Sequence, residues 1–261
     1  MEVDIFIKRR RQYILFGLVL VAFALMSSNI TQYDPIKGIL SIPKAVVWMV
    51  TNFYPNAQSM AKLPDILSKL HETIFLSIAA TTTASIFALF FGLMGSKTTK
   101  LNGTLSTLSR LIGSISRNIP DVVWAMLLLF SFGQNVVTGY LALFFVTFGT
   151  LTRAFIETID EASESAVEAL RATGANYFQI VFQAVIPSSI PQMLSWILYM
   201  IETNIRSATL IGILTGTGIG FAFNLYYKNL NYHTASLVVL VIVLSVLILE
   251  GISNYVRRVI L

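Results

Sequence analysis

Residues 192–214, QMLSWILYMIETNIRSATLIGIL, form an apolar run that is long enough to cross a lipid bilayer. A membrane-spanning helix needs about 20 consecutive, mostly apolar residues. Backbone groups in lipid must be hydrogen-bonded within their own segment, so we expect the run to be helical. Its charged residues, Glu202 and Arg206, lie near its middle. The run therefore predicts an integral membrane protein with polar chemistry inside one span.

The composition of the whole chain agrees with a membrane protein. Of 261 residues, 55% are hydrophobic and 12% are charged, whereas soluble domains carry about 25% charged residues. The net charge is +5, but most basic residues flank apolar runs, so we expect no nucleic-acid partner. The chain has no cysteine and two histidines, which argues against disulfides and against a metal site. These observations exclude an ordinary soluble enzyme.

Further apolar runs bring the expected number of spans to six. They are residues 13–30, 73–95, 111–133, 136–152 and 234–256. The predicted fold class is an all-α integral membrane protein with six transmembrane helices. We divide it into residues 1–71, a helix with a long outer loop, and residues 72–261, a core domain with five transmembrane helices. Within the outer loop, residues 42–54 predict an interfacial or re-entrant helix that aromatic side chains anchor.

The distribution of lysine and arginine sets the expected orientation, because cytoplasmic loops are enriched in both. If the N-terminus is inside, the inside segments hold more basic residues than the outside segments. We therefore expect a multi-pass protein of a prokaryotic plasma membrane with both termini in the cytoplasm. Residues 8–11 followed by residues 13–26 also resemble a cleavable signal peptide. Cleavage there would leave the other five spans in place.

The segment between the fourth and fifth spans, residues 157–191, is expected on the cytoplasmic side. Five acidic residues fall at helical spacing on one face: Glu157, Asp160, Glu161, Glu164 and Glu168. Gly174 interrupts this helix, and an amphipathic stretch resumes at Ala175 and ends at Pro187. Such a helix–glycine–helix element fits a docking site for a soluble partner. The alternative interpretation is a solvated surface helix.

Charged residues inside the spans are a second candidate site, because each costs about 2.5–3.5 kcal/mol at the centre of a helix on insertion scales. Glu202 and Arg206 are four residues apart with the acid first, the favoured order for an ion pair. Arg117 and Asp121 repeat this spacing in reverse order. Either these are structural pairs that lock the helices, or the arginines face a polar pathway, together with Asn204, and attract an anion.

Residues 212–220, GILTGTGIG, are rich in glycine, with Gly212, Gly216, Gly218 and Gly220. Their spacing does not match a dinucleotide-binding motif. They predict a tight turn at the outer end of the fifth span, where the backbone approaches another helix closely. The sequence also contains no phosphate-binding loop and no catalytic motif. We expect no catalytic residue, metal or cofactor on this chain, and any ATP hydrolysis on a separate chain.

The segment between the fourth and fifth spans resembles the EAA loop of ABC-importer permeases. That pattern is Glu-Ala-Ala, three residues, glycine, nine residues and Ile-x-Leu-Pro. Here Glu168-Ala169-Leu170 precedes Gly174 at this interval and Pro187 closes the pattern, with departures at Leu170, Ala184 and Ile186. The resemblance implies that an ATPase-coupling site contains Glu164, Glu168, Ala169, Leu170, Arg171, Ala172, Gly174, Ala175 and Pro187.

The next stretch is similar to phosphonate-transporter permeases. The matching residues are Tyr199, Glu202, Asn204, Arg206, Ala208, Thr209, Gly212 and Gly218–Phe221, with further matches at Phe53-Tyr54-Pro55, Arg117-x-Ile119-Pro120, Tyr232, Ala235 and Ser253. Thr217 stands where the family often has glycine. The resemblance covers roughly residues 70–258.

This second resemblance implies a type I ABC-importer permease that works as a homodimer. It implies two ATPase subunits inside, which hold ATP and Mg, and a solute-binding protein outside. The implied solute is a phosphonate, phosphite or phosphate. Methionine, a metal complex or another small solute is the alternative cargo, and an ion-driven secondary transporter is the alternative mechanism.

Overall fold

The computed structural model describes residues 2–162 and 164–260, and this part of the chain is helical without any strand. The chain divides into two compact units, Met1–Phe53 and Tyr54–Leu261. The first unit contains α1 (Glu2–Thr31) and α2 (Pro35–Asn52), and no residue of α2 is buried. The helix expected at residues 42–54 starts earlier because the Asp34 carboxylate accepts hydrogen bonds from the backbone N–H groups of Ile36 and Lys37.

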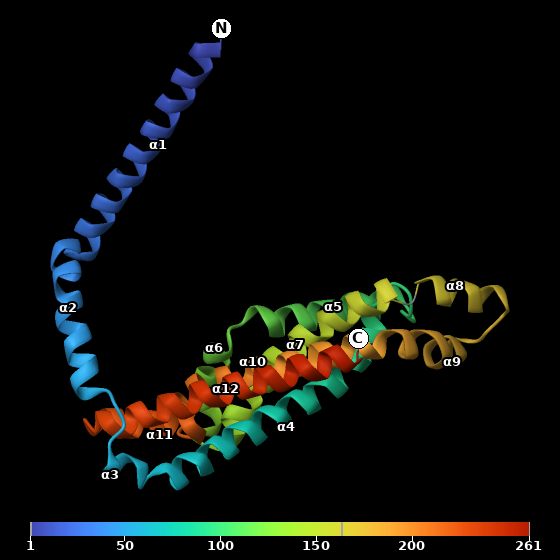
Figure 1. Ribbon diagram of the computed structural model, residues 1–261. Coiled ribbons are helices and arrows are strands. Elements are labelled where there is room, and N and C mark those ends of the chain that lie inside the picture. The colour runs from blue at the N-terminus through green and yellow to red at the C-terminus, as the bar shows by residue number, and fades with distance from the viewer. Residues whose placement is uncertain (1, 163, 261) are drawn as a thin grey trace. The chain divides into compact units, whose positions relative to one another are not determined.

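The second unit is a bundle of long helices with shorter ones at its two ends. In chain order, its elements are α3 (Ala57–Met60), α4 (Leu63–Gly95), α5 (Gly103–Asn118), α6 (Asp121–Phe132), α7 (Val136–Ala162), α8 (Glu164–Ala172), α9 (Tyr177–Ile180), a π-helical turn (Val181–Val185), α10 (Ile186–Thr215), α11 (Gly218–Lys228) and α12 (Tyr232–Ile260). Figure 1 shows α8 and α9 together at one end of this bundle and α3 and α11 at the other.

The predicted fold class is confirmed. Within the described residues, five helical segments are long and apolar enough to cross a membrane, and the bent pair α5–α6 brings the number to as many as six. The five segments are Phe6–Thr31, Leu63–Gly95, Val136–Glu161, Tyr177–Thr215 and Tyr232–Val259.

Helix α7 lies at the centre of the second unit and contacts α4, α5, α6 and α10. Leu151 and Phe155 of α7 pack in one core cluster with Ala84 and Ala88 of α4. Gly149 meets the backbone of α5 so closely that an added Cβ would strike the main chain. Small residues at such contacts let helices in a membrane pack backbone against backbone. The centre of the unit is therefore tightly packed around α7.

The third span is not the single helix that its apolar run predicts. Helices α5 and α6 meet at 91° across Ile119 and Pro120. Proline has no N–H group, and it disfavours helical geometry at the residue before it. Trp124 of α6 connects the two sides of the bend, because its indole N–H donates to the carbonyl oxygen of Ser116 in α5 at 3.2 Å. Residues 111–133 are therefore helical on both sides of the bend, in α5 and α6, but not through it.

The amphipathic stretch after Gly174 does not end at Pro187, as the sequence suggested. Helix α10 begins at Ile186, directly after the π-helical turn, and contains Pro187 in its first turn and Pro191 further along. A π-helical turn shifts the backbone hydrogen-bond register, so the segment before a proline can remain helical. The fifth span is consequently one long rod that continues into α9.

Candidate functional site

Helix α8 ends at a glycine whose backbone conformation is needed for the turn. Gly174 has φ +80, and nothing lies within 4 Å of the place where its Cβ would be. Its N–H donates to the carbonyl oxygen of Arg171 at 3.0 Å, and the N–H of Ala175 donates to Leu170 at 3.1 Å. Glycine adopts this left-handed conformation without steric cost. The glycine therefore sets the direction in which the chain leaves α8.

One side of α8 is packed and the other is exposed. Val167 is 1% exposed, and Leu170 and Ala175 pack against the same core cluster. The remaining coupling residues whose side chains are described are exposed: Glu168, Ala169, Arg171, Ala172 and Gly174, with Pro187 exposed on α10. The side chain of Glu164 lies outside the described part of the structure. The exposed side of α8 is thus available to another protein.

The five acidic residues expected on one helical face lie on both sides of residue 163, which is outside the described part of the structure. Glu157, Asp160 and Glu161 lie in α7 (Val136–Ala162), and Glu164 and Glu168 lie in α8 (Glu164–Ala172). Glu157 pairs with Arg153 of the same helix at 2.8 Å. The carboxylate of Asp160 instead contacts the turn that follows α4. Asp160 is therefore engaged inside the protein and not part of an exposed acidic face, and helical spacing alone did not identify its partners.

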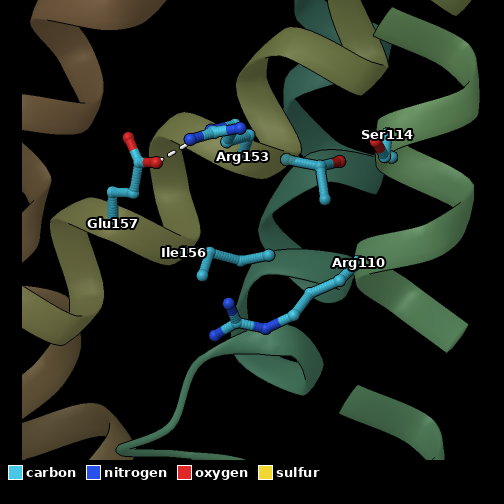
Figure 2. A pocket seen from close by; sticks show the side chains of 7 residues that line it. Arg110, Ser114, Arg153, Ile156 and Glu157 are labelled. Carbon is cyan, nitrogen blue, oxygen red and sulfur yellow. Dashed lines mark hydrogen bonds and ion pairs between the residues drawn. The ribbon is translucent and has the colours of Figure 1, made fainter. Parts of the chain in front are cut away.

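A cavity of about 270 Å³ lies between α5 and α7. Its lining residues are Arg110, Gly113, Ser114, Thr152, Arg153, Ile156 and Glu157. Figure 2 shows Arg153 beside Glu157, and the guanidinium group of Arg110 on the other side of Ile156. The two arginines therefore do not converge on one ligand, despite lining the same cavity.

The pair expected between Glu202 and Arg206 is present and has a third member. The Glu202 carboxylate accepts from Arg206 at 2.6 Å and from Arg257 of α12 at 3.4 Å. Arg257 also donates to Ser253 at 3.0 Å. Glu202 is 8% exposed, so two cations offset the cost of burying its charge. The contact with Arg257 was not predicted, because a contact across 55 residues leaves no local pattern in the sequence.

Asn204 joins three helices inside the bundle. Its side-chain amide donates to Thr81 of α4 at 2.8 Å and to Thr147 of α7 at 2.7 Å. All three residues are buried. Hydrogen bonds of this kind hold helices together in lipid, each by roughly 0.6 kcal/mol on average. Asn204 therefore has a structural role beside any contact with a solute.

The pair expected between Arg117 and Asp121 does not form. Arg117 lies in the last turn of α5 and Asp121 begins α6 beyond the bend. The Asp121 carboxylate accepts from the backbone N–H of Val122 at 2.8 Å. Arg117 is exposed and has no ion pair within the described residues. The helical spacing failed here because the helix does not continue through Pro120.

The glycine-rich segment forms a close junction between α10, α11 and α4. Gly216 and Gly218 have φ values of +71 and +60. The N–H of Gly218 donates to the Glu72 carboxylate at 3.2 Å, and that of Ile219 donates to the Thr73 hydroxyl at 2.8 Å. A Cβ at Gly212 or at Gly220 would strike the main chain of the facing segment. These positions require glycine because two backbones meet there.

Beyond these centres, the described residues contain no group of three or more His, Cys, Asp and Glu side chains that could hold a metal ion.

Next to the glycine junction, burial and then the nearby Asp65 carboxylate raise the pKa of the Tyr226 phenol. The tyrosine therefore remains neutral well above physiological pH.

Comparison with known proteins shows the family. Residues 84–260 match the family described as the inner membrane component of binding-protein-dependent transport systems. The chain belongs to this family. The match includes α8, Gly174, the Glu202 network and the glycines of the junction. The chain is thus a multi-span membrane component of a transport system and not an enzyme.

Several curated relatives of this inner membrane component have transport functions in their names. It is 28% identical to the phosphate-import permease protein PhnE of Mycolicibacterium smegmatis over 73% of this chain and 36% of the relative. It is 28% identical to the phosphite transport system permease protein PtxC of Stutzerimonas stutzeri over 72% of this chain and 69% of the relative. The alignment thus spans about a third of the first relative's length and two thirds of the second's.

Solved structures show the same fold as this inner membrane component. An amino acid ABC transporter aligns with a TM-score of 0.64 and 18% identity, over 78% of this chain and 98% of that chain. The MetNI methionine ABC transporter in an inward-facing conformation aligns with a TM-score of 0.61 and 19% identity, over 76% and 98%. These alignments establish the type I ABC-importer permease fold.

Proposed function

We propose that this chain is the transmembrane permease subunit of an ATP-driven importer for phosphonates or related phosphorus oxyanions, including phosphite and phosphate. The observation that carries this assignment is the family match together with the names of the relatives. They include the phosphate and phosphite permeases above and a putative cryptic phosphonate permease, PhnE2 of Escherichia coli, which is 31% identical over 118 residues. Methionine or another amino acid is the alternative cargo, and the solved structures favour it by fold alone.

In this proposal two copies of the chain form a homodimer in the inner membrane of a prokaryote. Each copy presents the exposed side of α8 to an ATPase subunit, which binds ATP and Mg. The exposure of Glu168 and Arg171 supports this contact. A solute-binding protein docks at the opposite end, near α3 and α11. Both chain termini are then cytoplasmic, in agreement with Arg257 and Arg258 in the last turn of α12.

ATP binding closes the ATPase subunits and moves α8, and alternating access follows from the movement of the helices attached to it. Val167 and Leu170 support this step because they anchor α8 to the core of α4, α7 and α10. Gly174 fixes the exit direction of the chain, so movement of α8 is passed into α9 and α10. A tightly packed interior transmits such displacement with little internal deformation.

The translocation path in this proposal passes Arg206. Half of the Arg206 side chain is exposed, whereas its partner Glu202 is buried. A guanidinium group binds oxyanions through several N–H donors and remains charged. Arg117, exposed at the end of α5, offers a second cation, while Asp121, Glu202 and Asn204 hold helices in position. An arginine path attracts a phosphorus oxyanion and disfavours a neutral solute.

Transport by the complete complex in proteoliposomes tests the assignment. The permease is reconstituted with its ATPase subunit and binding protein, and uptake of labelled phosphite, phosphate, a phosphonate and methionine is compared. We expect ATP-dependent uptake of at least one phosphorus oxyanion and none of methionine. Uptake of methionine alone would establish the alternative cargo. Uptake that depends on a proton gradient and not on ATP would refute both.

The role of Arg206 is tested by Arg206→Gln in the same assay. We expect the rate of oxyanion uptake to fall by about tenfold or more, because a hydrogen bond to a charged group contributes about 1.5–3 kcal/mol. Lys8→Gln is the control, because it removes an exposed cation from α1, which belongs to the other compact unit. Unchanged uptake by a folded Arg206→Gln complex would leave Arg206 a structural partner of Glu202.

A further inference from the structure

The turn between α4 and α5 is folded around the carboxylate of Asp160, which belongs to α7. One carboxylate oxygen accepts from the Ser96 hydroxyl at 2.5 Å and from the backbone N–H of Lys97 at 2.8 Å. The backbone N–H and the hydroxyl of Thr98 lie at 3.3 Å from the same oxygen. Ser96 is fully buried. A single side chain therefore satisfies the polar groups of a turn more than 60 residues away in sequence.

The other oxygen of Asp160 contacts α5. It lies 3.5 Å from a terminal guanidinium nitrogen of Arg110. The Nε–H of Arg110 donates to the carbonyl oxygen of Gly95 at 2.8 Å, at the end of α4. The Ser106 hydroxyl of α5 donates to the same carbonyl oxygen at 3.0 Å. Asp160 and Arg110 thus connect α7, α5 and the end of α4 through one polar network.

This network is in contact with α8. Arg171, in the last turn of α8, donates to the carbonyl oxygen of Thr98 at 2.8 Å. The acceptor belongs to the residue whose N–H is held by Asp160. A displacement of α8 therefore acts on the same three-residue turn that Asp160 fixes in place. The turn directly follows α4, and Arg110 of α5 contacts both Asp160 and the end of α4. A displacement of the turn can therefore act on both helices.

We propose that Asp160 is a positioning residue for energy coupling: it holds the turn at residues 96–98 so that movement of α8 reaches α4 and α5 through Arg171. The inference rests on the proposed function in one respect, namely that α8 contacts an ATPase. The contact through Arg171 is a second route by which movement of α8 is transmitted, beside the packing of Val167. It also gives a role to Asp160, which helical spacing had grouped with the exposed acidic residues. Without the charge of Asp160, the ion pair with Arg110 is lost and the hydrogen bonds to the turn become weaker, so the turn is held less firmly to α7.

The test compares Asp160→Asn with the wild type in the complete reconstituted transporter. The measured quantity is the number of ATP molecules hydrolysed per solute taken up, with complex assembly and melting temperature recorded in parallel. We expect the complex to assemble and hydrolyse ATP, while this ratio rises about fivefold or more, a typical size for coupling between sites. Asp160→Glu should restore part of the coupling. A purely structural role would lower assembly or melting temperature and leave the ratio unchanged.

Glu250→Gln is the matched control, because it also replaces a carboxylate by an amide, at an exposed position of α12 outside this network. It should leave the ratio at the wild-type value. Arg110→Gln tests the other half of the ion pair and carries the experiment if Asp160→Asn fails to assemble. The double variant should be no worse than the worse single variant, because both changes remove one network.

The absence of cysteine from the chain permits a direct structural readout. Spin labels at Lys100→Cys and Ser165→Cys report the distance between the turn and α8. In the wild-type background this distance should stay the same with and without ATP, and in Asp160→Asn it should broaden or shift. An unchanged ratio together with an unchanged distance in Asp160→Asn would overturn the inference. Absence of any ATP-driven uptake by the wild-type complex would instead refute the proposed function.

Discussion

Two turns at opposite ends of the bundle solve the same problem in different ways. In each, a side chain from another helix accepts hydrogen bonds from N–H groups of the turn: Asp160 from Lys97 and Thr98, and Glu72 with Thr73 from Gly218 and Ile219. The glycine junction adds steric closure, because a Cβ at Gly220 would strike the main chain of α10. The turn at Asp160 has no residue with positive φ and depends on one charge. The glycine junction is therefore fixed by steric contact. The turn at residues 96–98 is held by an interaction that can be broken and formed again.

Among the variants that test this comparison, Gly220→Ala is expected to lose the most stability. The new methyl group has no space beside the carbonyl oxygen of Thr209, so α10 and α11 must separate. We expect a loss of about 3 kcal/mol in the free energy of unfolding, the upper range for overpacking. Thermal unfolding of the purified protein in detergent measures it. Gly251→Ala, where the added Cβ meets nothing within 4 Å, should melt like the wild type, and equal melting temperatures for both variants would contradict steric closure.

A smaller effect is expected from Thr73→Val, which keeps the shape of the side chain and removes its hydroxyl. The buried N–H of Ile219 then loses its acceptor. A buried donor left without a partner costs about 1–3 kcal/mol, so we expect a loss near 2 kcal/mol in the same unfolding assay. Thr82→Val is the control, because that hydroxyl bonds only within its own helix and is exposed. If the two variants have the same stability, the hydrogen bond to Ile219 does not hold the junction.

The smallest loss of stability is expected from Asp160→Asn, although its effect on coupling is large. The turn lies at the end of the bundle, where Lys97 and Thr98 can bond to water instead. We expect a loss of about 1 kcal/mol in the free energy of unfolding, the net value of an ordinary hydrogen bond. A loss as large as that of Gly220→Ala would show that both turns are structural locks. The comparison would then no longer distinguish them.

Features whose signal is local were readable from the sequence. The apolar runs predicted the spans, Gly174 predicted the end of α8, and the Glu202–Arg206 spacing predicted an ion pair, because each depends on neighbours within a few residues. The bend at Pro120 was not predicted, because a transmembrane helix can contain a proline and still continue. Helix α10 continued through Pro187 because the π-helical turn before it removes the conflict.

Features that depend on contacts between distant residues could not be read in this way. Arg257 reaches Glu202, and Asp160 reaches Ser96, across more than 50 residues. Helical spacing placed Asp160 among solvent-facing acids, since periodicity shows which residues share a face but not what that face meets. The Asn204 contacts with Thr81 and Thr147 were not predicted either, because these residues are also far apart in the sequence.

Helix α10 has a mechanical consequence that follows from its length. It is one uninterrupted helix of 30 residues, and at 1.5 Å per residue it is a rod about 45 Å long. Pivoting such a rod by about 5° at one end would sweep its other end through roughly 4 Å. A small rotation of α10 near α9 would thus become a displacement of several ångströms at its far end, without bending the helix. The length of α10 sets how large such a displacement can be.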